Sequence, residues 1–223
     1  MSVRRAETTP GPRAKPRLRG LSHEIAFFLA LPLGVALVLE PETTRGRVSA
    51  IVFAASVAAM FGASALYHRV TWSSRRRPWM RRLDHAGIYA LIAGTYTPFG
   101  LLVLSGNWSI GVLAIVWTGA AAGVALKFLW VDAPKWLSAV IGVALGWVGI
   151  VAFPQILDRI GLAPALLVLA GGVAYTAGAV IYALRRPDPF PAVFGYHELF
   201  HLFVIAAVAC HYVAVAVYVL PEH

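Results

Sequence analysis

Seven runs of apolar residues, each long enough to cross a bilayer, dominate this chain of 223 residues. A helix needs about 20 residues to span roughly 30 Å of hydrocarbon. With 59% hydrophobic and only 13% charged residues, and without the alternation of a membrane β-barrel, the sequence predicts an all-α polytopic membrane protein, a seven-helix transmembrane bundle. The expected helices cover residues 24–40, 48–68, 83–104, 109–130, 136–153, 163–184 and 197–219.

The chain is divided into a basic N-terminal tail and a transmembrane domain. Residues 1–20 combine Arg, Pro and Gly with almost no large apolar residue, a composition that cannot bury enough surface to fold alone. We therefore expect a disordered basic cytoplasmic tail at 1–20 and one transmembrane domain at 21–223. The breaks between the apolar runs are too short to hold a second domain.

The basic residues predict the orientation, because Lys and Arg are retained on the cytoplasmic side. Every second connection between the spans lies on the same side of the membrane. The N-terminal tail and the connections on its side hold sixteen of the 19 basic residues, and the other side holds Arg45, Arg47 and Arg159. We expect a cytoplasmic N-terminus and, with seven spans, an external C-terminus. The net charge of +9 then indicates contact with anionic lipid headgroups. A nucleic-acid partner is excluded, because no folded basic domain is present.

Three polar pairs interrupt the apolar runs, where ionisable side chains are costly and usually functional. They are Ser64 with His68, Asp84 with His85, and His197 with His201. The predicted orientation places all three near the cytoplasmic ends of their helices. Residues four apart share a helix face, so three histidines from two helices could fill three positions of a tetrahedral zinc site and leave the fourth for water. Asp84 would be a natural partner for that water.

Four segments carry a resemblance to a known family. They are SALYHRV (64–70), RRLDHAGIYALIAGTYTPF (81–99), GGVAYTAGAVIYALRRPDPFP (171–191) and FGYHELFHLFVIAAVACHY (194–212). The chain resembles the bacterial hemolysin III proteins, which are similar to the adiponectin and progestin receptors within a superfamily that contains alkaline ceramidases. The resemblance implies that His68, His197 and His201 bind zinc, that Asp84 contacts the water at the metal, and that Ser64 supports the site. It also implies seven helices with a cytoplasmic N-terminus.

The predicted site favours hydrolysis of lipids. Zinc lowers the pKa of bound water toward ~7 and polarises carbonyl groups, and a neighbouring carboxylate can transfer the proton to a leaving group. At membrane depth the accessible carbonyls belong to lipid amide and ester bonds. We expect a zinc-dependent lipid amidase or esterase with Asp84 as the general base and Ser64 orienting a ligand or stabilising an oxyanion.

Other functions stay open at this stage. The protein could instead be a non-enzymatic receptor or sensor of membrane lipid state with structural zinc, or a cytolytic, pore-forming protein. The pore is disfavoured because no span carries a continuous row of polar residues. His197, Glu198 and His201 also match the His-Glu-x-x-His pattern of metalloproteases, which would need a third ligand further along the chain.

Several polar residues have simpler interpretations. His23 opens the first helix and is expected to cap it at the interface, with entry to the metal site as the alternative. His85 can orient Asp84, line the pocket or play a structural role. Lys127 can snorkel to the inner surface. His211 lies ten residues beyond His201, roughly 15 Å further along a helix, and is not expected to be a ligand. The Arg-rich and Ala-rich composition suggests a bacterial plasma membrane and leaves the oligomeric state open.

Overall fold

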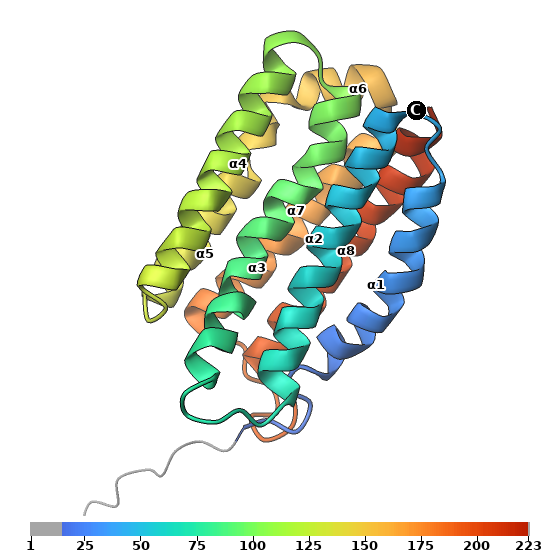
Figure 1. Ribbon diagram of the computed structural model, residues 1–223. Coiled ribbons are helices and arrows are strands. Elements are labelled where there is room, and N and C mark those ends of the chain that lie inside the picture. Colours follow the sequence, from blue (N-terminus) through green and yellow to red (C-terminus); the bar gives the residue numbers. More distant parts are fainter. Residues whose placement is uncertain (1–14, 223) are drawn as a thin grey trace, which may run out of the picture.

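The computed structural model describes residues 15–222 and consists of helices joined by short connections (Figure 1). The α-helices are α1 (Leu21–Leu39), α2 (Thr44–Arg69), α3 (Arg77–Pro98), α4 (Gly106–Leu129), α5 (Lys135–Gly146), α6 (Phe153–Ile160), α7 (Leu162–Leu184) and α8 (Tyr196–Ala214). Shorter helical turns follow three of them, at Phe99–Val103, Val148–Ala152 and Val215–Val219, and a last turn covers Leu220–Glu222. Within the described range the structure contains one isolated β-bridge, between Phe190 and Phe194.

The helices combine into seven that are long and apolar enough to cross a membrane. The third continues from α3 to Val103, the fifth runs through α5 and α6, and the seventh extends α8 to Val219. The predicted all-α fold with seven membrane-spanning helices is therefore confirmed.

Small residues bring the helices of this bundle close together. In lipid, large apolar side chains can face outward at no cost, and helices associate through close packing of small residues. Phe28 on α1 is 63% exposed, as expected for a side chain that faces lipid. A Cβ atom at Gly94 of α3 would overlap the side chain of Ser56 on α2, and one at Gly123 of α4 would press on the ring of Tyr89. Glycine is thus required where α3 meets its two neighbours.

One end of the bundle, the lower end in Figure 1, holds the start of α1, the α2–α3 connection at 70–76, the start of α5 and the α7–α8 connection at 185–195. We call it the basic end. The backbone amides of Arg17 and Leu18 donate to the carbonyls of Ala192 and Val193 there, each at 3.1 Å. Residues 15–20 are therefore attached to the bundle, whereas residues 1–14 of the expected disordered tail lie outside the described range. The C-terminus lies at the opposite end (Figure 1).

Candidate metal centre

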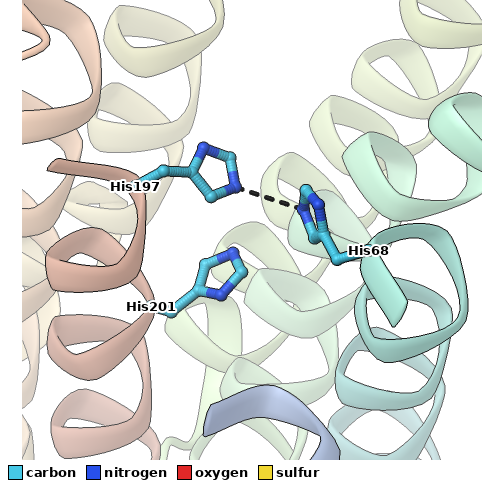
Figure 2. Close-up of side chains that lie close together, drawn as sticks. All are labelled: His68, His197 and His201. Atoms are coloured by element: carbon cyan, nitrogen blue, oxygen red, sulfur yellow. Dashed lines mark hydrogen bonds between the residues drawn. The ribbon is translucent and has the colours of Figure 1, made fainter. Parts of the chain in front are cut away.

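Three buried histidines from two helices meet at the basic end of the bundle (Figure 2). His68 lies in the last turn of α2, and His197 and His201 lie in the first two turns of α8. One ring nitrogen of each lies within 4.8 Å of the others. The Nε2 atoms of His68 and His197 are 3.2 Å apart. The predicted spacing of four residues thus places two imidazoles on one face of α8, opposite a third from α2.

The end of α2 is held in place by the N-terminal segment. Gly20 has a φ of +83° and packs so closely on His68 that a Cβ atom there would collide with it. Lys15 donates a hydrogen bond to the backbone carbonyl of His68, an acceptor that the end of the helix leaves unpaired. Burial, together with the positive charge of Arg19, lowers the pKa of Lys15. Residues 15–20 therefore cover the histidine cluster at the basic end.

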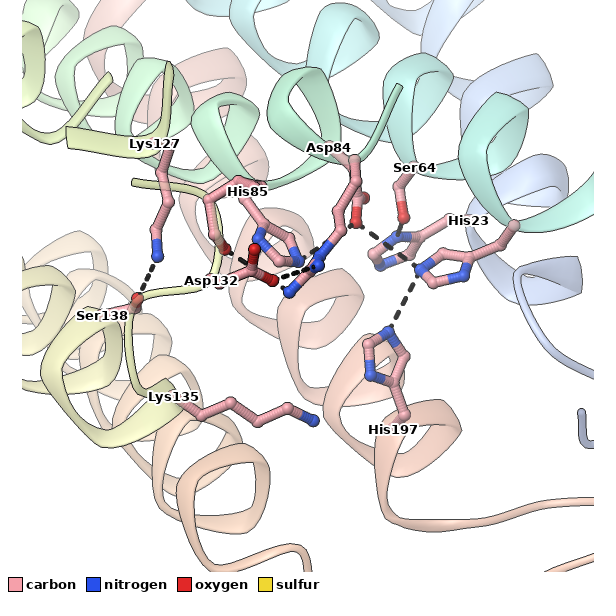
Figure 3. A network of polar contacts seen from close by, with 12 residues as sticks. His23, Ser64, Asp84, His85, Lys127, Asp132, Lys135, Ser138 and His197 are labelled. Atoms are coloured by element: carbon pink, nitrogen blue, oxygen red, sulfur yellow. Dashed lines mark hydrogen bonds and ion pairs between the residues drawn. The ribbon is translucent and has the colours of Figure 1, made fainter. Parts of the chain in front are cut away.

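Asp84 is not among the groups that could share a metal ion with the histidines, but it lies close to Ser64 and to the cluster (Figure 3). Its Oδ2 atom is 3.6 Å from Nε2 of His68, the same nitrogen that faces His197. His85, the next residue on α3, also approaches Asp84, with 3.9 Å between Nε2 and Oδ2. The carboxylate is thus within reach of a molecule held between the imidazoles.

Ser64 contacts His23, which we expect from the sequence to cap the first helix or to stand at the entry to the metal site. Its Oγ atom is 2.8 Å from Nδ1 of His23, and the His23 ring stacks on His201 with centroids 3.7 Å apart and 10° between the planes. His23 is only 2% exposed. The expectation that it caps α1 at the interface is wrong, because α1 packs against α8 at this point. No sequence pattern indicated that contact.

Glu198, the acidic residue of the His-Glu-x-x-His pattern, is engaged outside the cluster. Its carboxylate pairs with Arg19 and accepts a hydrogen bond from the backbone amide of Gly195 at 2.8 Å, which caps α8. It is not among the groups that could share a metal with the histidines. His211 also lies outside that group, and its Nε2 approaches the carbonyl of Val168 at 3.1 Å. His211 therefore does not supply the third ligand that the protease interpretation requires, and the carboxylate of Glu198 is already paired with Arg19.

Comparison with known proteins places this chain among membrane proteins. Residues 13–212 match the family model described as Haemolysin-III related. The chain belongs to the haemolysin-III-related family. It is 32% identical to Hemolysin-3 of Bacillus cereus over 209 residues, which cover 90% of each protein. It is also 32% identical to the heptahelical transmembrane protein ADIPOR2 of Oryza sativa subsp. japonica over 185 residues, 75% of this chain and 80% of that protein.

A more distant relative is the human Monocyte to macrophage differentiation factor, 25% identical over 176 residues, which are 76% of this chain and 69% of that protein. These matches confirm the resemblance drawn from the four sequence segments. The chain is therefore a multi-pass membrane protein of the haemolysin-III-related family. All five predicted site residues lie within the matched region.

A cavity of about 180 Å³ adjoins the site of this haemolysin-III-related protein. Side chains of α3, α4, α5, α7 and α8 line it, and most of them are apolar. His85 and Tyr182 form part of its wall, and the Tyr182 ring lies 5.8 Å from that of His197. The volume is more than ten times the ~15 Å³ that one water molecule needs. An apolar ligand chain in this cavity would end close to the histidines and Asp84.

The histidine cluster has the donor set that zinc prefers. Two Nε2 atoms face each other at hydrogen-bonding distance, and Nδ1 of His201 is buried without a hydrogen-bond partner in the described part of the chain. Neutral imidazole nitrogens are common zinc ligands, and three protein ligands leave a position free. The residues present therefore fit a zinc ion, with His68, His197 and His201 as the groups that would hold it.

Proposed function

We propose that this protein is a zinc-dependent hydrolase that cleaves an amide or ester bond of a membrane lipid at the cytoplasmic leaflet of a bacterial plasma membrane. The observation that carries the proposal is the convergence of three buried imidazole nitrogens within 4.8 Å, with the Asp84 carboxylate beside them. Ionisable groups gathered inside a membrane bundle are costly and indicate a functional site.

Each part of the site has a task in this proposal. Zinc bound to the three histidines would lower the pKa of a water molecule and polarise a carbonyl group. Asp84 accepts the proton of the attacking water and returns it to the leaving amine or alkoxide. Ser64 holds His23 through the hydrogen bond, and His23 supports His201 through the ring stack. The apolar cavity takes the acyl chain and aligns the scissile carbonyl next to His197.

Metal content and hydrolysis, measured on the same purified samples, test the proposal. Wild-type protein should contain about one zinc per chain, and His201→Ala should lose most of it, because two imidazoles seldom hold zinc tightly. His211→Gln is the matched control, since it changes a buried histidine of the same helix outside the cluster and should keep the metal. A wild-type zinc content in His201→Ala would contradict the assignment of the ligands.

Asp84→Asn then separates the hydrolase from the alternatives. With a fluorescent short-chain ceramide and a fluorescent acyl ester as substrates, this variant should lose activity about 100-fold or more while keeping its zinc. Wild-type protein that holds zinc but cleaves neither substrate class would instead favour a receptor or sensor of membrane lipid state with structural zinc.

A lytic function is the second candidate, because the Bacillus cereus relative carries the name Hemolysin-3. Wild-type protein that releases a dye from liposomes, with the same release from Asp84→Asn, would favour it over the hydrolase.

A further inference from the structure

A second polar site lies in the cavity, on the side formed by α4 and α5. Lys127 of α4 is not open to the surroundings of the bundle, because it is only 3% exposed and lines the cavity. Its ammonium group contacts the hydroxyl of Ser138 on α5 (Figure 3). Among residues 15–221, whose side chains the structure describes, no carboxylate lies within ion-pair distance of it. A buried cation with only a neutral partner is costly, and an anion beside it would lower that cost.

The carboxylates near this site have other partners. Asp132 is 73% exposed along its side chain and pairs with Arg81 at 2.6 Å. Asp84 approaches His68 and His85. A second ammonium group nearby also has no carboxylate in the described range. Lys135 donates to the Tyr196 hydroxyl at 2.7 Å and lies 4.5 Å from the centre of the Tyr182 ring, which lines the cavity. This end of the cavity therefore carries an excess of positive charge.

We propose that Lys127, Ser138 and His85 bind the phosphate group of a membrane phospholipid whose acyl chain occupies the apolar part of the cavity. All three residues line that cavity, and they offer an ammonium, a hydroxyl and an imidazole from three helices. Lysine binds phosphate as a point charge. These three donors suit the strongly accepting oxygens of a phosphate group.

The position of the site fits a lipid rather than a soluble phosphate. Lys127 lies two residues before the end of α4, so its ammonium group is near the depth of lipid headgroups. The cavity wall beyond it is formed by apolar side chains such as Ile88, Ile92, Val168 and Val204. A phospholipid whose headgroup lies at Lys127 and whose acyl chain lies along this wall would contact both the charged and the apolar part of the cavity. The binding requires neither zinc nor hydrolysis and so extends beyond the proposed function.

Equilibrium binding of oleoyl-lysophosphatidate to the full-length protein in detergent, followed by native mass spectrometry, tests the inference. Lys127→Met should weaken this binding about tenfold or more, since hydrogen bonds to a charged group contribute ~1.5–3 kcal/mol. Lys127→Arg should retain most of it. Ser138→Ala should weaken it about threefold through the loss of one hydrogen bond, and it provides a second variant if Lys127→Met does not fold. Arg77→Met, which removes an exposed charge at the basic end, should leave the affinity unchanged.

Three comparison ligands identify the group that is recognised. Monooleoylglycerol has the same chain without the phosphate, and it should bind about tenfold more weakly and be insensitive to Lys127→Met. Inorganic phosphate should not displace the lipid at equal concentration, and oleate should bind more weakly than the lysophosphatidate.

Equal binding of the neutral lipid, effective displacement by phosphate alone, equal affinity for oleate or an unchanged Kd in a folded Lys127→Met would each overturn the proposal. His201→Ala should bind the lysophosphatidate normally, which keeps this test independent of the metal site.

Discussion

At the residue scale, two contacts of His23 join α1 to its neighbours. Its ring nitrogen contacts Ser64 of α2, and its ring stacks on His201 of α8. The hydroxyl–imidazole hydrogen bond fixes the orientation of His23, and its ring covers one face of His201. The Nε2 atom of His23 is buried without a partner in the described part of the chain. Replacing a group that orients a metal ligand typically lowers metal affinity about 10–100-fold. The first helix is thus a structural part of the site, although it carries none of the three proposed ligands.

His23→Ala is therefore expected to weaken zinc binding about tenfold, at the lower end of the range for residues that orient a ligand. The His201 ring loses its stacked neighbour and can rotate. Competition with a chelator of known affinity measures the change. Phe28→Ala, on the same helix but facing lipid, is the control and should bind zinc as the wild type does. An unchanged zinc affinity in His23→Ala would show that the stack has no part in holding the metal.

At the scale of the helices, α2 and α3 must lie close together for His68 and Asp84 to meet. Gly94 permits this, because a Cβ atom there would overlap the Ser56 side chain and lie 3.3 Å from the backbone carbonyl of Val52. Gly87, two turns closer to Asp84, lies in the same way against Met60. The two glycines keep one face of α3 flat along its contact with α2.

Gly94→Val should lower the free energy of unfolding by about 1–3 kcal/mol, the usual cost of overpacking, and should reduce the zinc content because α2 moves away from α3. Thermal unfolding of the detergent-solubilised protein, with metal analysis alongside, measures both effects. Gly111→Val in α4 is the matched control, since nothing lies within 4 Å of a Cβ atom at that position. Equal melting temperatures for the two variants would contradict the role of Gly94.

The helices themselves were predictable because hydropathy alone identifies segments of spanning length. Their ends were less so. The third helix begins at Arg77 rather than 83, and the fifth continues past 153 to Ile160 through a turn and α6, since helices extend into polar residues beyond the apolar run. The sequence could predict that His68 lies near His197 and His201 for two reasons. His197 and His201 are four residues apart and so share a helix face, and the number of spans between them and His68 puts these helix ends on the same side of the membrane. The inward turn of Lys127 and the burial of His23 depend on helix–helix contacts that no local pattern encodes.

At the scale of the whole molecule, basic residues divide between the two ends of the bundle. Arg81, Arg82, Lys127 and Lys135 belong to the basic end, where the proposed metal and phosphate sites also lie. Arg159 lies at the opposite end and donates to Ser105 at 2.9 Å. Because positive charge is retained in the cytoplasm, we expect both proposed sites to face the cytoplasmic leaflet. That leaflet is also the one rich in anionic lipid.

Single-cysteine labelling tests this orientation. Cys210, the only cysteine, is first replaced by Ala, and a cysteine is then placed at Glu42 in the α1–α2 connection or at Ser74 at the basic end. A membrane-impermeant maleimide should label Glu42→Cys in intact cells and Ser74→Cys only after permeabilisation, because sixteen of the 19 basic residues favour a cytoplasmic basic end. The Cys210→Ala protein without a new cysteine gives the background. The reverse pattern would place the histidine cluster at the external face, where neither the lipid of the inner leaflet nor a cytoplasmic substrate could reach it.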